Sequence, residues 1–176
     1  MRRIILLVAF MSLCFVGKAQ RLSFDQLNGM LSSTLDEAEE RLFLVGYSFV
    51  SKQYISDSAE VIYHFSNKKN TIGTAKKVSK GVYTKDLDKS FVKYTTYDRA
   101  EFQNFRKLMV EYQFTRSGKD SISENSNYSK DNLLVNFEVT ADQYENKTFL
   151  ITLTNNKAII SDKLPKKISL KSIFKQ

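Results

Sequence analysis

The chain has 176 residues, of which 42% are hydrophobic, and its formal net charge is +8, from 27 Lys and Arg against 19 Asp and Glu. One cysteine and one histidine are too few for a metal site built from several cysteine or histidine ligands. None of the motifs G-x-G-x-x-G, G-x-x-x-x-G-K or G-x-S-x-G occurs, so the sequence offers neither a phosphate-binding loop nor a nucleophile elbow.

The N-terminal residues have the three-part pattern of a secretory signal peptide. Arg2-Arg3 precedes the apolar run Ile4–Val16, and Gly17-Lys18-Ala19 places small residues three and one positions before a cleavage site at Gln20. The apolar run is shorter than the about 20 residues that a membrane-spanning helix needs. We therefore expect residues 1–19 to be a signal peptide, and the protein to be exported to the periplasm or the extracellular space of a bacterium.

Two alternatives to a cleaved signal remain open. The segment could stay uncut as an N-terminal anchor, or Cys14 could be the acylated residue of a lipoprotein, although Leu13 is a poor match to the small residue that such a site needs. With cleavage, Cys14 is lost, and residues 20–176 contain no disulfide and no thiol nucleophile.

The positive charge lies mostly outside the predicted domain. Cleavage lowers the net charge from +8 to +5, and residues 162–176 carry +4 of this, from five lysines against Asp162. Residues 20–161 are close to neutral, whereas a nucleic-acid-binding domain carries its positive charge on the folded surface. We expect a single domain over residues 20–161, a basic C-terminal tail over 162–176, and no nucleic-acid partner.

The tail is itself amphipathic. Leu170, Ile173 and Phe174 would share one face of a helix. That face would pack on the domain, which is the favoured interpretation, or lie on an anionic membrane surface.

Residues 24–45 have the periodicity of a long helix. Ser23 is a candidate N-cap with Gln26 at the capping-box spacing, and Gly46 is a suitable left-handed residue at the end. Gly29 would either divide the helix or weaken it by about 1 kcal/mol relative to Ala. The apolar positions are Phe24, Leu27, Leu31, Leu35, Ala38, Leu42 and Val45. The opposite face carries Asp36, Glu37, Glu39 and Glu40, which we interpret as a solvated surface and not a metal site.

A second helix is predicted after the candidate N-cap Asp98, with Glu101 three residues on. Its apolar face comprises Phe102, Phe105, Met109 and Tyr112. Alternation of apolar and polar residues predicts strands on both sides of it. These strands cover Tyr47–Ser51, Ala59–Ser66, Gly81–Thr84, Phe91–Thr96, Tyr112–Arg116, Leu133–Thr140, Thr148–Thr154 and Ala158–Ile160.

Ser117–Asn132 is the longest polar segment. About 16 residues without regular structure are unusual inside a compact domain. The segment is either a functional or mobile loop, or it contains a short strand around Tyr128.

These elements predict an α+β fold, with two helices packed on one face of an antiparallel sheet. The helices match at an offset of 67 residues, Leu35 with Phe102 and Leu42 with Met109, and a Tyr-x-Phe string recurs at an offset of 65. A duplicated helix-plus-strands unit would produce this match. So would coincidence, since amphipathic helices that precede strands resemble one another.

The residues that could carry catalysis are few. His64 lies in an alternating strand, on the face opposite Tyr63 and Phe65, where a surface or cross-strand role is favoured over that of a base. Glu138, with Asp142 or Glu60, is the carboxylate pair that a glycosidase-type hydrolase could use, but cross-strand partners for lysine are the favoured interpretation. No catalytic, cofactor-binding or metal-binding residue is assigned, and no cofactor is expected.

The lysine-rich region Lys68–Lys93, with Tyr83, Phe91 and Tyr94 among its lysines, is either a basic surface for an acidic partner or, as we favour, a solubility feature. Function on α+β scaffolds usually lies in loops or on an open sheet face. The expected places are therefore Tyr63, Tyr94 and the loop Ser117–Asn132.

The function expected from the sequence is that of a non-enzymatic binding module whose partner is another envelope or secreted protein. The plan is loosely similar to that of small exported inhibitor and immunity-type proteins, a similarity of architecture that no motif carries. Two alternatives stay open: a carboxylate-dependent hydrolase of the cell envelope, and an envelope-associated accessory protein held by its basic tail. The oligomeric state is not predicted.

Overall fold

A computed structural model of the chain describes residues 21–55, 60–68, 75–83, 90–117 and 124–155. The predicted signal peptide, the strand Ala158–Ile160 and the basic tail lie outside these residues. Three helices are described: α2 (Phe24–Ser32), α3 (Leu35–Leu44) and α4 (Arg99–Glu111). Eight strands are described: β1 (Ser48–Ile55), β2 (Glu60–Ser66), β3 (Lys77–Tyr83), β4 (Ser90–Thr96), β5 (Thr115–Ser117), β6 (Ser126–Lys130), β7 (Leu133–Ala141) and β8 (Lys147–Asn155).

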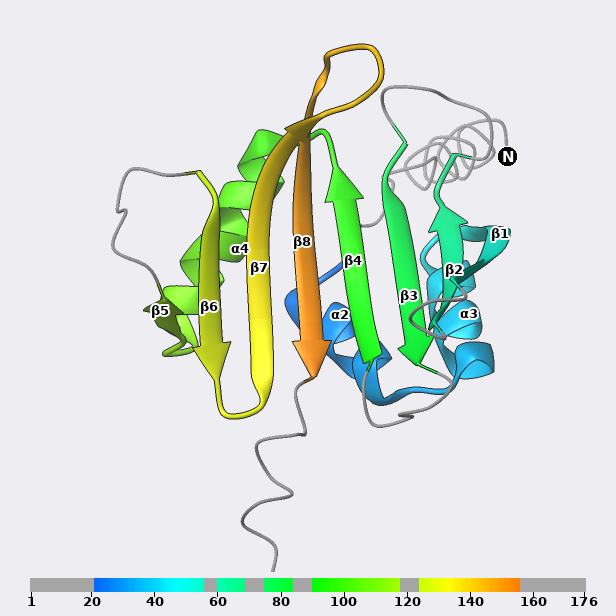
Figure 1. Ribbon diagram of the computed structural model, residues 1–176, viewed down its shortest axis with the longest axis horizontal. Coiled ribbons are helices and arrows are strands. Elements are labelled where there is room, and N and C mark those ends of the chain that lie inside the picture. Colours follow the sequence, from blue (N-terminus) through cyan, green and yellow to red (C-terminus); the bar gives the residue numbers. More distant parts are fainter. Residues whose placement is uncertain (1–20, 56–59, 69–74, 84–89, 118–123, 156–176) are drawn as a thin grey trace, which may run out of the picture.

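The eight strands form one antiparallel sheet in the order β1-β2-β3-β4-β8-β7-β6-β5 (Figure 1). β1 to β4 are successive neighbours, and so are β5 to β8. The two groups meet where β4 pairs with β8 at the centre of the sheet, with Tyr94 opposite Ile151. The fold is therefore mixed, mostly sheet, and consistent with the predicted α+β class.

The helices lie behind the sheet in the view of Figure 1, with α3 near β1 and β2, α2 near the centre and α4 behind β6 and β7. α2 contacts β4 and β8, α3 contacts β1, and α4 contacts β8 and β4. Apolar side chains from all three helices and from alternate strand positions form one buried cluster. Its members with no exposed surface include Leu27, Ala38, Leu42, Val78, Val92, Tyr94, Phe102, Met109, Ile151 and Leu153.

The prediction of one long helix over residues 24–45 is wrong, because this segment forms two helices. The chain breaks at Ser33 and Thr34, which both have extended backbone angles, and Thr34 starts α3 with a capping box to Glu37. Gly29 lies inside α2 and does not divide it. The predicted capping box between Ser23 and Gln26 is confirmed. α3 ends as predicted, with Gly46 at φ 85°.

The predicted strand Tyr112–Arg116 is too long. Tyr112 is the C-cap of α4, and Gln113 adopts the left-handed conformation at φ 62°. The helix therefore ends in a motif that usually has glycine at the left-handed position. Because Gln113 stands there, the sequence does not indicate this end of the helix. Only Thr115–Ser117 forms a strand, and Asp98 is confirmed as the N-cap of this helix.

The other strands predicted within the described residues are present, with shifted ends. β3 begins at Lys77, four residues before the predicted start at Gly81. A strand around Tyr128 is confirmed inside the polar segment, where β6 pairs with both β5 and β7. Tyr128 is buried against the ring of Phe137, at 5.5 Å between centroids, so this part of the segment belongs to the core.

Candidate interaction site

Exposed apolar side chains gather at one edge of the sheet. Among the described residues, nine large hydrophobic side chains are exposed, and five of them lie between positions 43 and 54. They come from the last turn of α3 and from β1, which contact one another. These five residues are Phe43 (71% exposed), Leu44 (72%), Phe49 (40%), Val50 (45%) and Tyr54 (62%). We call this surface the α3–β1 edge.

Among the described residues, β1 is the end strand of the sheet and pairs only with β2. Edge strands with free backbone groups are templates for pairing with another strand, and proteins protect them by bulges or charges. β1 is irregular between Phe49 and Ser51, where two residues face one on β2. From Lys52 to Ile55 its pairing is regular, and every residue from Ser48 to Tyr54 is exposed.

The helical side of this edge is acidic. α3 carries Asp36, Glu37, Glu39 and Glu40 against the single base Arg41, and all five are exposed. Glu37 also accepts the backbone N–H of Thr34, which places its charge at the N-terminus of the helix. The edge therefore combines apolar side chains with a net negative charge.

The α3–β1 edge was not predicted from the sequence, although a signal was present. Phe43 and Leu44 stand between the predicted core positions Leu42 and Val45, so a helix cannot bury all four. Phe49 and Val50 are likewise adjacent in a strand, where successive side chains point to opposite faces.

The expected positions Tyr63 and Tyr94 are not on an open face. Tyr94 is completely buried and lies 6.0 Å from the ring of Phe105 in α4. Tyr63 packs against the same core, with Lys52 Nζ 5.4 Å from its ring centroid. Both tyrosines are therefore structural. Of the loop Ser117–Asn132, residues 118–123 lie outside the described part of the chain.

His64 lies on the sheet face opposite the helices, as its alternation predicts. Its Nδ1 is 2.9 Å from Ser79 Oγ on β3, the residue that pairs with it across the strands. Partial burial and the nearby charges of Lys77 and Lys93 lower the pKa of His64. The imidazole thus favours the neutral form, and the described residues give it no carboxylate partner.

Phe91 lies flat on the same face. A methyl group at Gly81 would be 1.9 Å from its ring, so the ring occupies the space above the glycine that pairs with it. This arrangement fixes the aromatic side chain against the sheet.

The lysine-rich segment divides between the two faces, so it does not form one basic surface. Lys77 and Lys93 lie on the face of His64. Lys80 is buried on the helix side at 2% exposure, and its Nζ donates a hydrogen bond to the carbonyl of Met30 near the end of α2. Burial lowers the pKa of Lys80 to about 8.

Lys76 belongs to a buried polar cluster around Glu101, whose carboxylate is 4% exposed. Lys76 Nζ lies 2.8 Å from Glu101 Oε2, Thr96 Oγ1 donates to the same oxygen at 2.8 Å, and Tyr94 Oη donates to Oε1 at 3.0 Å. Burial is the main cause that raises the pKa of Tyr94 and that of Tyr47, the latter to about 12. The Glu101 carboxylate is fully bonded and buried, which indicates a structural role.

The carboxylate pair Glu60 and Glu138, considered for hydrolysis, is too far apart for that chemistry. β3, β4 and β8 lie between the strands of Glu60 and Glu138, so their backbones are about 19 Å apart at 4.8 Å per strand. Glycosidase pairs lie about 5–9.5 Å apart.

Asp142 orders the β7–β8 turn. Its Oδ1 accepts the N–H groups of Tyr144 and Asn146, and its Oδ2 accepts the hydroxyl of Tyr97 at 3.2 Å. Partial desolvation raises the pKa of Asp142, but the hydrogen bonds from Asn146, Tyr144 and Tyr97 outweigh it and hold the pKa below its usual value.

Within the described residues, no group of three or more His, Cys, Asp or Glu side chains could hold a metal ion. None of the helices in that part of the chain is both long and apolar enough to cross a membrane. Comparisons with models of protein families, with curated proteins and with solved structures find no match to this chain.

Proposed function

We propose that this protein is an exported, non-enzymatic binding module that holds a partner protein at the α3–β1 edge. The observation that carries the proposal is the concentration of five exposed apolar side chains on a free edge strand and the helix beside it. Such a concentration on a soluble protein is typical of an interaction surface.

The chemistry of the edge defines the partner. A partner segment in extended conformation would add a ninth strand beside β1 through backbone hydrogen bonds, the β-augmentation mode of recognition. Apolar side chains of that segment would contact Tyr54 and Val50. Basic side chains would face Glu39 and Glu40 of α3, since complementary charge steers association and fixes register.

Export supports the choice of partner class. The signal-like residues 1–19 and the loss of Cys14 with them suit a protein that acts outside the cytoplasm. The partner would then be an envelope or secreted protein. Mass spectrometry of the protein from its native host should find Gln20 as the first residue, whereas an intact chain that starts at Met1 would contradict export by cleavage.

The proposed origin of the fold is a duplication of one helix-plus-four-strands unit. Helices α3 and α4 end in the same hydrogen-bonded motif at an offset of 67: Tyr47 N–H to the Leu42 carbonyl, and Phe114 N–H to the Met109 carbonyl. The left-handed residues Gly46 and Gln113 also match at 67. This match supports Phe114, and not Tyr112, as the equivalent of Tyr47.

Site-specific photocrosslinking tests the interaction surface in the native host. A photoreactive phenylalanine analogue replaces Tyr54 on β1 or, as the matched control, Tyr144 in the β7–β8 turn, which is similarly exposed at 54%. We expect a discrete protein adduct at position 54 and none at 144. The Leu44→Glu variant should remove the adduct, because a charge at the apolar contact disfavours binding.

Purified components then separate the outcomes. Charge reversal by Glu39→Lys with Glu40→Lys should weaken binding of the adduct protein and reverse its salt dependence. An adduct of twice the chain's own mass would identify a second copy as the partner and reject the proposed heterologous partner. Equal adducts at positions 54 and 144, or none at either, would refute the site.

A further inference from the structure

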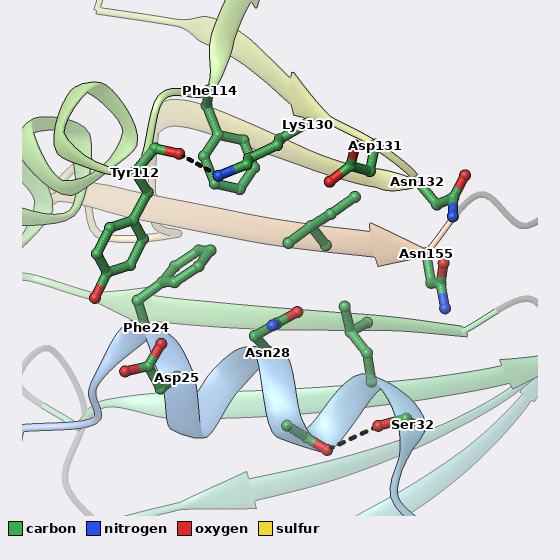
Figure 2. A pocket seen from close by; sticks show the side chains of 13 residues that line it. Phe24, Asp25, Asn28, Ser32, Tyr112, Phe114, Lys130, Asp131, Asn132 and Asn155 are labelled. Atoms are coloured by element: carbon green, nitrogen blue, oxygen red, sulfur yellow. Dashed lines mark hydrogen bonds between the residues drawn. The ribbon is translucent and has the colours of Figure 1, made fainter.

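A second candidate site lies on the helix side, away from the α3–β1 edge. An open pocket of about 490 Å³ is lined by α2, the end of α4 and the turn between β6 and β7 (Figure 2). We call it the α2 pocket. Its volume is within the range of about 300–1,000 Å³ that small-molecule sites occupy.

The floor of the α2 pocket is apolar and aromatic. Phe24 and Leu31 of α2 are buried there, and Phe114 and Leu133 are partly buried. The Phe24 ring contacts that of Phe114 edge-to-face at 5.9 Å and that of Tyr112 at 5.6 Å. Tyr112 is 37% exposed, so part of its ring remains free at the mouth of the pocket.

The rim of the pocket is polar, and five of its side chains have no hydrogen-bond partner among the described residues. Figure 2 shows Asn28 on α2 and, across the pocket, Asp131 on the turn, with Asn132 and Asn155 at the far end. Together with Asp25, these five side chains make no hydrogen bond within the described part of the chain.

Several Asp and Asn side chains elsewhere have structural partners. Asp98 caps α4, Asp142 orders a turn, and Asn125 accepts the N–H of Val139. The rim of the α2 pocket is therefore a concentration of free donors and acceptors above an apolar floor.

The charge of the pocket is nearly balanced. Asp25 and Asp131 contribute two carboxylates. Lys130 contributes one ammonium group, whose Nζ donates to the Tyr112 carbonyl at 2.7 Å and lies 6.0 Å from the Phe114 ring centroid. The charged side chains of the lining therefore sum to only −1, from two carboxylates and one ammonium group, and this small charge suits a neutral ligand.

We propose that the α2 pocket binds a neutral sugar, of the size of a mono- or disaccharide. A pyranose ring has apolar C–H faces, which would lie against Tyr112 and Phe114, and a periphery of hydroxyl groups that both donate and accept hydrogen bonds. Amide side chains such as Asn28 and Asn132 can do both, and carboxylates such as Asp131 accept. The pocket offers both kinds of group, with aromatic surface on its floor and amides on its rim.

Titration followed by NMR tests the proposal on the ¹⁵N-labelled protein purified in its exported form. The probes are cellobiose, maltose and N,N′-diacetylchitobiose, in the millimolar range. We expect saturable shifts of the backbone amides of Gly29 and Leu133 with at least one of these neutral disaccharides. Each of Asn28→Ala and Asn132→Ala should weaken binding about fivefold, the effect of one lost hydrogen bond.

The controls separate this site from the α3–β1 edge and from misfolding. Asn136→Ala, at an exposed position of β7 outside the pocket, should leave the affinity unchanged. Thermal unfolding should show that all three variants remain folded, since Asn28 and Asn136 are exposed. Leu44→Glu at the α3–β1 edge should also leave sugar binding unchanged.

Three results would overturn the proposal. The first is the absence of saturable shifts with all three sugars. The second is sugar binding that Asn28→Ala with Asn132→Ala does not weaken. The third is binding of the basic peptide acetyl-Gly-Lys-Gly-amide at the same amides without binding of any sugar, which would assign the pocket to a cationic ligand.

Discussion

Replacement of Lys76 by methionine should destabilise the protein much more than its partly exposed position suggests. The change removes the one cation that the described part of the chain pairs with Glu101, while the glutamate side chain stays buried at 4% exposure and keeps two hydroxyl donors. Loss of one partner of a buried ion pair costs about 3–5 kcal/mol, because an uncompensated charge remains in a medium of low polarity. The Lys76 side chain is 15% exposed, so water can reach its place, and we expect about 3 kcal/mol.

The assay is equilibrium unfolding in urea, repeated by thermal melting. A loss of about 3 kcal/mol corresponds to a decrease in the melting temperature of about 10 °C for a chain of this size. Lys147→Met is the matched control, since Lys147 also pairs with a glutamate, Glu124 at 3.3 Å, but its side chain is 63% exposed. That exposed pair should contribute about 0.5 kcal/mol or less.

The double variant Lys76→Met with Glu101→Gln tests the cause. With the buried charge removed, the amide oxygen can accept one of the two hydroxyls and the amide NH2 can donate to the other, so part of the lost stability should return. The double variant should therefore be more stable than Lys76→Met alone by about 1–2 kcal/mol. If the two substitutions are additive, or if Lys76→Met costs no more than Lys147→Met, the argument from an uncompensated buried charge is refuted.

Three further predictions concern stability. Because burial lowers the pKa of Lys80 from 10.5 to about 8, the unfolded chain binds more protons in this window, so the free energy of unfolding should rise with pH. The rise from this group is about 1.5 kcal/mol between about pH 8 and pH 9.5, and urea unfolding of Lys80→Met should lack it; an equal rise in the variant would assign it to other groups. Gly81→Ala should lower the free energy of unfolding by about 1–3 kcal/mol, because the added methyl group displaces the Phe91 ring. Adding Phe91→Ala to this variant should recover part of the loss. A double variant no more stable than Gly81→Ala would contradict the steric cause. Thr34→Ala should cost about 1 kcal/mol through loss of the cap of α3, measured against Thr34→Ser, which keeps the hydroxyl and should stay near the parent.

Most of the secondary structure could be predicted because its signals are local. Alternation located β2, β4, β7 and β8, and the caps at Ser23 and Asp98 located two helix starts. The break at Thr34 was missed because the apolar period continues through it, from Leu31 to Leu35. The end of α4 was misplaced because Gln113 adopts the left-handed conformation without being glycine.

The faces of the sheet were harder to assign. Alternation divides Tyr94 from Lys93 but does not tell which set the helices cover, so Tyr94 was expected on an open face and is instead buried. Lys80 is a similar case. Its ammonium group is buried because the carbonyl of Met30, 50 residues away in sequence, accepts its hydrogen bond.

The surfaces proposed for binding could not be predicted by motif. The exposed pair Phe43 and Leu44 was visible only as an excess of apolar residues over what one helical face can bury. The α2 pocket depends on residues 24–32, 112–114 and 130–133, and on Asn155, which only the fold brings together.

The strand order has a consequence for how the chain folds. Every pair of neighbouring strands is local in sequence except β4 with β8, which joins residue 90 to residue 155. Each group of four strands can therefore form through short-range contacts, whereas the central pair must close a long loop at an entropic cost. Variants at this central pair, such as Ile151→Val opposite Tyr94, should slow folding, and variants at β1 should mainly speed unfolding. Kinetic stability would then be set at the outer strands of the sheet, and the folding rate at its centre.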